Sequence, residues 1–289
     1  MSEAGSPALR DSVPLIAPDA PADPNPGRGR ERLARFLAPL LIGLLALAIW
    51  ELVVRVNDIP HYILPAPSLV LRTLVEDWST LFPSLLVTLQ ITFMALAVAV
   101  VGGVGLAILF TMSKWVELSL FPFAVILQVT PIISIAPLIL IYVSNVNLAL
   151  LICAWIVAFF PILSNTTLGL NSADHNLRDL FQLYGASRWQ TLLHLRLPAA
   201  MPYFLGGLKI AGGLALIGAI VAEFAAGTAG TGSGLAYRIL EAGYRLNIPR
   251  MFAAVILISF TGILIFMAFT LLSHLLLRNW HESAIARER

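Results

Sequence analysis

The stretch DLFQLYGASRWQTLLHLRLPAAMP, residues 179–202, is polar and charged, yet it lies between two long apolar runs. Leu177, Leu180, Phe181 and Tyr184 recur at the i, i+3, i+4, i+7 spacing of one helix face. Gly185 follows at once, and glycine just past the last turn commonly ends a helix in the left-handed conformation. The spacing therefore predicts a short amphipathic helix that ends at Gly185.

A second short helix is predicted directly after this glycine. Ser187 and Gln190 have the S-x-x-Q spacing of a capping box, which opens a helix. The same helical spacing continues, mostly with apolar residues, at Trp189, Leu192, Leu193 and Arg196. Pro198 and Pro202 are then expected to break the helix and turn the chain toward the next apolar run. We therefore expect two short amphipathic helices hinged at Gly185.

The apolar stripes of these helices have two possible environments. They can lie on the protein's own helix ends or on the lipid surface, or they can enter a groove on a soluble partner. The first helix has one basic residue, Arg178, next to Asp179, which is a poor composition for binding anionic lipid. Periodicity alone leaves both readings open.

The composition around this loop is that of an integral membrane protein. Of the 289 residues, 58% are hydrophobic and 12% are charged, and the mean hydropathy is +0.87. Soluble domains have about 25% charged residues. The five histidines and the single Cys153 show no metal-type spacing, so we expect no metal site and no internal disulfide.

Uncharged runs mark the membrane spans. There are 36 uncharged residues between Asp77 and Lys114, 56 between Glu117 and Asp174, and 27 between Arg250 and Arg278. A span needs about 20 residues, so the run of 56 is enough for two spans with a turn at SNVN, residues 144–147. We expect an all-α membrane protein with six transmembrane helices, at about 36–54, 84–112, 118–143, 148–168, 203–226 and 251–277.

Basic residues in the flanking segments predict the orientation. With the N-terminus inside, thirteen Lys and Arg residues fall on the cytoplasmic side and five on the outer side. Both termini and the 169–202 loop are therefore expected in the cytoplasm. We divide the chain into a disordered, proline-rich tail (1–32), a transmembrane domain (33–280) and a short C-terminal tail (281–289).

Several polar residues inside the predicted spans are candidates to line a solute path. Prolines 122, 131 and 137 in the third span and Pro161 in the fourth are expected to kink their helices. The neighbouring polar side chains can satisfy freed backbone groups, or they can line a path. The pathway candidates are Gln128, Thr130, Ser134, Asn165, Thr166 and Glu223.

The loop also carries a pattern that resembles a known family. Permease subunits of bacterial ABC importers have Glu-Ala-Ala, three residues, Gly, nine residues, Ile, any residue and Leu-Pro. Here Asp179, Gly185, Leu195 and Leu197-Pro198 stand at the corresponding positions, and Leu180-Phe181 replaces Ala-Ala, which makes this face bulkier. The flanks are similar to the nitrate, sulfonate and taurine branch, at FFPILSNT (159–166), LPAAMPYFLGGLKIA (197–211) and VAEF (221–224).

This resemblance, which covers most of residues 60–280, implies a function. It implies a type I importer permease in the bacterial inner membrane, with two ATPase subunits, a solute-binding protein and a second copy of this chain as partners. The loop would be the helix that couples to the ATPase. The residues at docking and hinge positions are Asp179, Leu180, Phe181, Tyr184, Gly185, Ala186, Ser187, Trp189, Leu197 and Pro198. The branch implies a sulfonate, taurine, nitrate, a thiamine-type pyrimidine precursor or a flavin as solute.

Other functions are less consistent with the residues. The chain has no G-x-x-x-x-G-K-[ST] motif, so we expect ATP hydrolysis in a separate subunit, and no cofactor, nucleic acid or enzymatic activity here. An ion-coupled secondary transporter would place ionisable groups deep in the membrane, whereas Glu51, Lys209 and Glu223 are near span ends. A passive channel gives no reason for the hinged loop. These remain the alternatives.

Overall fold

The computed structural model describes residues 27–227 and 232–278, and within these ranges the regular structure is helical throughout. The described chain divides into two units, one up to residue 52 and one from residue 53 on, which are described separately. The predictions for the N-terminal tail (residues 1–26) and for residues 279–289 lie outside the described residues.

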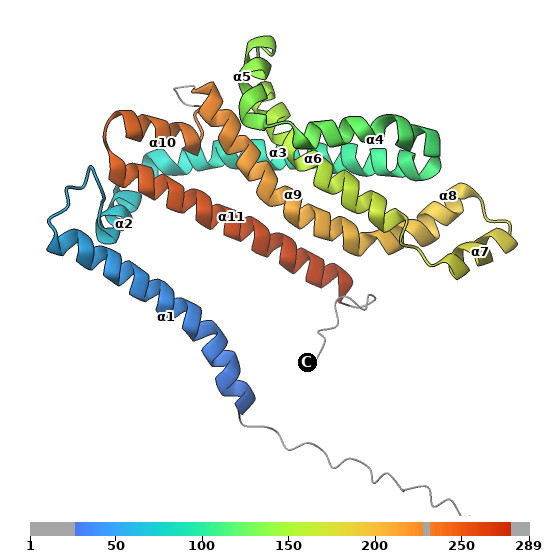
Figure 1. Ribbon diagram of the computed structural model, residues 1–289, viewed down its shortest axis with the longest axis horizontal. Coiled ribbons are helices and arrows are strands. Elements are labelled where there is room, and N and C mark those ends of the chain that lie inside the picture. The colour runs from blue at the N-terminus through green and yellow to red at the C-terminus, as the bar shows by residue number, and fades with distance from the viewer. Residues whose placement is uncertain (1–26, 228–231, 279–289) are drawn as a thin grey trace, which may run out of the picture. The chain divides into compact units, whose positions relative to one another are not determined.

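Five of the described helices are long and apolar enough to cross a membrane, and a bent pair makes up to six. In the first unit, the apolar part of α1 (Gly27–Val56), from Leu37 on, is almost entirely exposed, as expected for a helix that faces lipid. The second unit begins with the end of α1, followed by α2 (Pro67–Glu76) and α3 (Trp78–Met112). The expected all-helical, multi-span architecture is therefore present (Figure 1).

The third predicted span is wrong as a single helix. The segment 118–143 is divided between α4 (Lys114–Val129) and α5 (Ile132–Tyr142), which meet at an angle of 102°. Thr130 is extended, with φ −71° and ψ 123°, as residues before proline usually are. Pro131 then provides no N–H for a helix to continue. The helix consequently ends at Val129, and α5 leaves the body in a new direction (Figure 1).

The core of the second unit lies between α3, α6 (Val146–Leu170) and α9 (Leu197–Ala226). Small residues let these helices approach closely. A Cβ added to Gly207 of α9 would lie 2.8 Å from the Pro161 carbonyl oxygen of α6, and one added to Gly218 would lie 2.9 Å from the Ala154 Cα. Gly103 of α3 has a similarly short approach to Ile162. These glycines are needed for the close packing that holds membrane helices together.

The predicted helix break at Pro198 and Pro202 is also wrong. The chain runs from α8 (Arg188–Thr191) through a π-helical turn (Leu192–Arg196) into α9 without interruption. Pro198 stands in the first turn of α9, and the Leu197 N–H donates to the Leu192 carbonyl, five residues back. The wider π-turn accommodates the proline that would clash in a regular α-helix.

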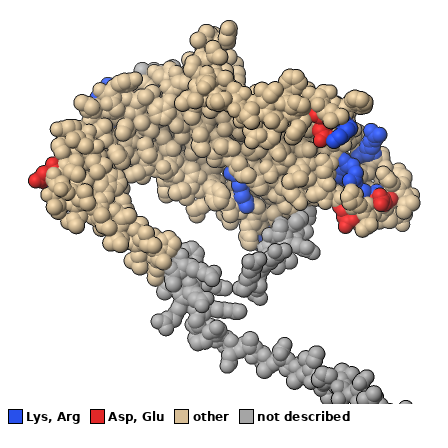
Figure 2. Space-filling view, in the orientation of Figure 1, with Lys and Arg blue, Asp and Glu red and all other residues tan. Residues whose placement is uncertain are grey.

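The other end of this unit holds a short helix and the last long helix. There α10 (Leu235–Tyr244) leads into α11 (Ile248–Leu277). Arg250 of α11 binds Asp77, at the start of α3, through two hydrogen bonds of 2.6 and 2.9 Å. In the space-filling view, charged side chains are sparse over the long helices and gather at the end that carries α7 (His175–Leu183) and α8 (Figure 2).

Candidate functional site

The loop that links α6 to α9 folds into a fixed helical hairpin. Asp174 caps the first turn of α7 by accepting a 2.7 Å hydrogen bond from the Asn176 N–H. At the other end, the Gly185 N–H donates to the Gln182 carbonyl and the Ala186 N–H donates to the Phe181 carbonyl. These two bonds form a Schellman motif, and Gly185 has the left-handed φ of +68° that the motif requires. The predicted helix end at Gly185 is confirmed.

The second helix of the hairpin opens with the predicted capping box. The Gln190 N–H donates to Ser187 Oγ at 3.3 Å, and the Ser187 N–H donates to Gln190 Oε1 at 2.7 Å. Ala186 is the only residue between the Schellman glycine and the capping serine. The link between α7 and α8 is thus short, and its backbone groups are hydrogen-bonded on both sides.

The hairpin presents an apolar cleft to its surroundings. Leu180 of α7 is 44% exposed, Tyr184 just after α7 is 84% exposed, and Trp189 of α8 is 60% exposed. A cleft of about 520 Å³ lies between the two helices, lined by Leu180, Phe181, Tyr184, Gly185, Ala186, Gln190 and His194. Five of the ten residues expected at docking and hinge positions therefore line one concave surface.

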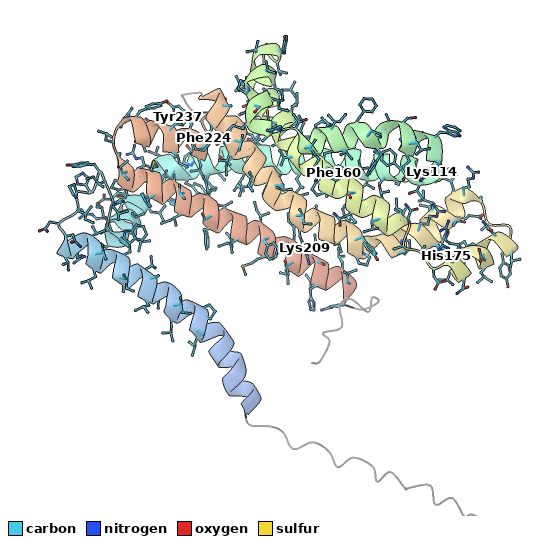
Figure 3. The ribbon with its side chains drawn as sticks, viewed as in Figure 1. Lys114, Phe160, His175, Lys209, Phe224 and Tyr237 are labelled. Atoms are coloured by element: carbon cyan, nitrogen blue, oxygen red, sulfur yellow. The ribbon has the colours of Figure 1, made fainter. Side chains whose placement is uncertain are left out.

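The other five expected residues lie outside this cleft. Asp179 is exposed on α7, Ser187 serves in the capping box, and Trp189 is exposed on α8. Leu197 and Pro198 are partly buried in the first turn of α9. Figure 3 shows His175 of α7 at the same end of the helical body as Lys114. Phe224 and Tyr237 lie at the opposite end, beyond the length of α9. The hairpin is thus separated from the opposite end of the helical body.

The candidates for a solute path are scattered over α4, α5, α6 and α9. Gln128 and Ser134 are exposed on either side of the α4–α5 break. Thr130 donates to the Ile126 carbonyl at 2.6 Å, and Asn165 donates to the Pro161 carbonyl at 2.9 Å, so both bond within their own helix. Nothing in these contacts brings the candidates together into one path, and their pathway role stays a prediction.

Thr166 has a different environment. Its side chain is buried, and among the described residues its hydroxyl has no hydrogen-bond partner. It borders an apolar groove of about 500 Å³ between α3 and α9, which Val100, Val104 and Phe204 also line. The hydroxyl itself is buried beneath the groove, whose surface is apolar, so these contacts do not make Thr166 a ligand of the groove.

Glu223 makes contacts that sequence reasoning missed. Its carboxylate, 3% exposed, accepts a 2.8 Å hydrogen bond from the Thr88 hydroxyl of α3 and a 3.0 Å bond from the Ala236 N–H. The Leu235 N–H donates to Thr88 Oγ1 at 2.9 Å. Leu235 and Ala236 begin α10, so Glu223 and Thr88 together satisfy the free N–H groups at that helix end. A Cβ on Gly234 would collide with the Glu223 carboxylate, which explains a glycine there.

A charged cluster lies on and beside α10. Arg238 donates hydrogen bonds to Glu241 at 2.8 Å and to Ser84 of α3 at 2.9 Å, and Arg245 lies 3.0 Å from Glu241. The hydrogen bond from Arg238 and the positive charges around it lower the pKa of Glu241. The ion pairs lie within α10 and its C-terminal end, and the Arg238–Ser84 hydrogen bond ties α10 to α3, the helix that also provides Thr88.

Comparison with known proteins gives this arrangement a context. The family model described as "Binding-protein-dependent transport system inner membrane component" matches residues 99–280. A formylaminopyrimidine transport permease protein, ThiX, of Halalkalibacterium halodurans is 34% identical over 86% of this chain and 97% of its own length. A putative aliphatic sulfonates transport permease protein, SsuC, of Bacillus subtilis is 29% identical, over 88% of this chain and 91% of its own.

The fold is also found among solved structures. A crystal structure of an amino acid ABC transporter with histidines matches with a TM-score of 0.58 and 19% identity, covering 71% of this chain and 96% of that chain. The match extends the agreement from sequence to three-dimensional arrangement. The chain lies in the inner membrane, is not itself an enzyme, and belongs to the family of inner-membrane permease components of binding-protein-dependent ABC importers.

Proposed function

We propose that this permease transmits ATP-driven movement through the α7–α8 hairpin, which docks in a groove of a separate ATPase subunit. The observation that carries the proposal is the apolar cleft around Leu180 and Phe181, on a hairpin fixed by the Schellman motif and the capping box. Amphipathic helices commonly bind a partner by placing such a face in a groove. A fixed link keeps the docked helix and α8 in one orientation.

The energetics favour a protein groove over water for this surface. Full burial of a leucine or phenylalanine side chain is worth about 1.5–3 kcal/mol. Leu180 is already half-covered in the free chain, so docking gains roughly half of that figure for this residue. Tyr184 and Trp189, which are more exposed, have more area left to bury. These side chains form the apolar centre of the proposed interface.

The docking proposal is tested with Leu180→Asp. An uncompensated carboxylate in an apolar groove should weaken ATPase binding about tenfold or more, since about 1.4 kcal/mol corresponds to a factor of ten. Co-purification of the ATPase from detergent and solute uptake by proteoliposomes measure the effect. His175→Asp is the matched control, because it adds the same charge to the side of α7 away from the cleft. Full ATPase binding and uptake by Leu180→Asp would overturn the proposal.

We further propose six spans, with both termini and the hairpin in the cytoplasm. The excess of basic residues, thirteen to five, supports this orientation. In this arrangement α4 and α5 count as one broken span. The type I importer architecture follows from the same assignment and is supported by the structural match.

The assembly is proposed to hold two copies of this chain, two ATPase subunits and one solute-binding protein. The apolar side chains of α5, including Ile133, Leu138 and Ile141, are exposed, and the helix leaves the body at 102° to α4. A second copy is a suitable neighbour for such a helix. Native mass spectrometry of the purified complex should show two copies of this chain; one copy beside a different permease would contradict the homodimer.

For the solute, we propose a small heteroaromatic compound of the pyrimidine type, with a sulfonate as the second candidate. The relative with the formylaminopyrimidine name has the higher identity of the two compared. Anion pathways usually present cationic side chains, whereas α3 and α6 contain no Lys or Arg and α9 contains Lys209 alone (Figure 3).

The solute proposal is tested with the complete transporter. Proteoliposomes that hold the permease, its ATPase and its binding protein should take up formylaminopyrimidine. They should respond less to riboflavin, an alkanesulfonate or nitrate at equal concentration. Preferential uptake of the alkanesulfonate would support the second candidate instead.

A further inference from the structure

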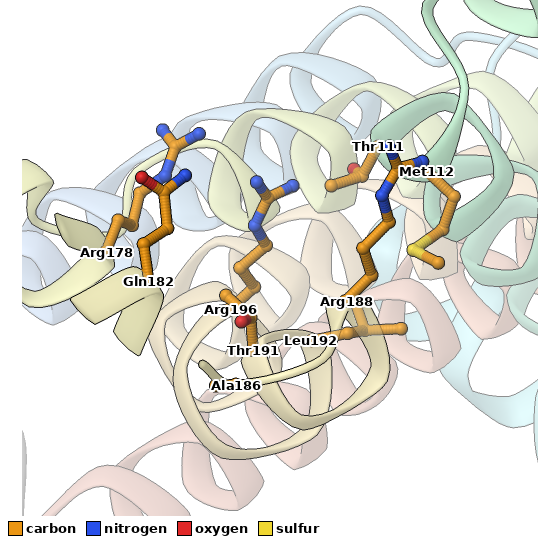
Figure 4. A pocket seen from close by; sticks show the side chains of 9 residues that line it. All are labelled: Thr111, Met112, Arg178, Gln182, Ala186, Arg188, Thr191, Leu192 and Arg196. Atoms are coloured by element: carbon orange, nitrogen blue, oxygen red, sulfur yellow. The ribbon is translucent and has the colours of Figure 1, made fainter. Parts of the chain in front are cut away.

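Three arginines from different parts of the hairpin line one pocket. Arg178 comes from α7, Arg188 from the first turn of α8, and Arg196 from the end of the π-helical turn. The pocket has a volume of about 320 Å³, and Thr111 and Met112, at the end of α3, form its opposite wall. Figure 4 shows the three side chains rising on the same side of the hairpin, with Arg188 reaching toward Thr111 and Met112.

The three arginines of the pocket have no ion-pair partner in the part of the chain that the structure describes. By contrast, Lys114 pairs with Glu117 and Arg250 pairs with Asp77. The acidic residue that begins this hairpin, Asp174, is used to cap α7. Three like charges that share one pocket repel one another unless an anion enters.

The chemistry of the pocket wall selects an oxyanion. Arginine provides only donors, arranged in a planar fork that matches the oxygens of a phosphate group. Arg178 and Arg196 are half-buried, so part of their hydration is already removed, while Arg188 is exposed at the pocket mouth. The Gln182 side chain stands beside Arg178 and adds an amide that can donate to the same ligand (Figure 4).

The pocket and the apolar cleft lie on different sides of the hairpin and share Ala186 alone among their lining residues. On α7, residues 178 and 182 are one turn apart on one face, whereas Leu180, Phe181 and Tyr184 lie on another. The arginines therefore face the end of α3, and the cleft faces away from it. An anion in the pocket would lie between the hairpin and the end of α3, on the side of α7 that does not carry Leu180 and Phe181.

We propose that Arg178, Arg188 and Arg196 form a binding site for a phosphate-type oxyanion that holds the hairpin against the end of α3. Two sources supply this chemistry at the membrane surface, soluble phosphate groups and the headgroups of anionic phospholipids. The bound anion neutralises the repulsion among the three guanidinium groups and links α7, α8 and α3 through charge-assisted hydrogen bonds. The proposal is independent of ATPase docking and of the transported solute.

The soluble source is tested on the full-length chain in a neutral detergent. Inorganic phosphate should raise the melting temperature in a saturable way, because a ligand that binds the folded state stabilises it. Sodium chloride at the same ionic strength should not. Arg178→Gln and Arg196→Gln should each weaken the apparent phosphate affinity about tenfold, the effect of losing a charge-assisted contact. Arg188→Gln, at an exposed position, provides a third variant that is expected to fold.

Two further variants distinguish a specific phosphate site from non-specific attraction by the positive charges at this end of the protein. Lys114→Gln removes one charge at the same end of the protein but outside the pocket, so it should keep the wild-type response. Arg178→Lys keeps the charge and removes the fork, so its phosphate affinity should fall below that of the wild type.

The lipid source is tested in vesicles of phosphatidylcholine with and without phosphatidylglycerol. Phosphatidylglycerol should stabilise the wild type more than Arg178→Gln or Arg196→Gln. A response to phosphatidylglycerol alone would assign the site to a headgroup, and a response to phosphate alone would assign it to a soluble anion. If the wild type responds to neither, or if the arginine variants respond as strongly as the wild type, the proposal is wrong.

Discussion

At the residue scale, Gly185 determines how the hairpin turns. Its φ of +68° lies in the left-handed region, and a Cβ added there would meet no atom within 4 Å. Any cost of substitution thus comes from the backbone conformation and not from a steric contact. The cost in the left-handed region is about 1–2 kcal/mol for most residues and less for asparagine.

Because the cost at Gly185 comes from the backbone conformation alone, two substitutions that differ in their tolerance of that conformation test its role. Gly185→Val should reorient α7 relative to α8 and reduce uptake and substrate-stimulated ATP hydrolysis together, while membrane insertion stays normal. Gly185→Asn should retain most of both activities, because asparagine tolerates the left-handed conformation. Uptake and ATPase rates in proteoliposomes measure both variants. Equal activity of Gly185→Val and Gly185→Asn would show that the glycine conformation has no part in coupling.

Glu223 supports a second prediction at this scale. Glu223→Ala should lower the melting temperature, because it leaves the Ala236 N–H buried without its acceptor, at roughly 1–3 kcal/mol for an unsatisfied group. The Thr88 hydroxyl can still donate to the Ser84 carbonyl, 3.2 Å away. Glu223→Gln keeps an acceptor oxygen and should destabilise less. Hydrogen exchange of the first amides of α10 should become faster in Glu223→Ala, and unchanged exchange would argue against the cap.

At the element scale, the helix starts depend on single side chains. Ser187→Ala removes the capping hydroxyl of α8 and should cost about 1 kcal/mol, with faster amide exchange at Gln190. Ser113 occupies the same position at the start of α4 but makes no side-chain cap hydrogen bond, so Ser113→Ala should leave exchange in α4 unchanged. A similar response of the two helices would mean that the capping box does not hold α8.

Local patterns predicted the elements whose causes are local. The i, i+3, i+4, i+7 spacing, the glycine after it and the S-x-x-Q motif all lie within a few residues of the features they predicted. The change of helix direction at Thr130–Pro131 lies inside an uncharged run. Hydropathy gives the length of such a run but not the direction of the helices in it, so the break was not predicted. The continuity across Pro198 was missed for a related reason. Whether a proline ends a helix or stands in its first turn depends on the preceding residues, here a π-turn.

At the scale of the whole molecule, the orientation in the membrane gives a direct prediction. Leu183 of α7 and Tyr244 at the end of α10 are 85% and 86% exposed, so both can accept a labelling cysteine. In a Cys153→Ala background, Tyr244→Cys should react with a membrane-impermeant thiol reagent added to cells with a permeabilised outer barrier, and Leu183→Cys should not. The reverse pattern would invert the proposed topology.

Contacts between distant segments were beyond the reach of the sequence. Thr88 and Glu223 are 135 residues apart, and no pattern in either segment indicates that they meet. The three arginines of the hairpin are ten and eight residues apart, yet their convergence depends on the turn at Gly185 and on the π-turn together. Sequence reasoning therefore identified the hairpin and its apolar face, and it missed the charged pocket on the other side.

Helical structure continues from Arg188 in the hairpin to Ala226, so a displacement of the hairpin is transmitted to α9. The 30 residues of α9 alone span roughly 45 Å at 1.5 Å per residue, more than the thickness of the hydrocarbon core. A tilt of α9 by roughly 5° about its Leu197 end would displace the Ala226 end by about 4 Å. That end of α9 carries Glu223, which accepts a hydrogen bond from the first turn of α10. A push delivered to α7 on one face of the membrane is therefore expected to arrive as a displacement of α10 on the opposite face.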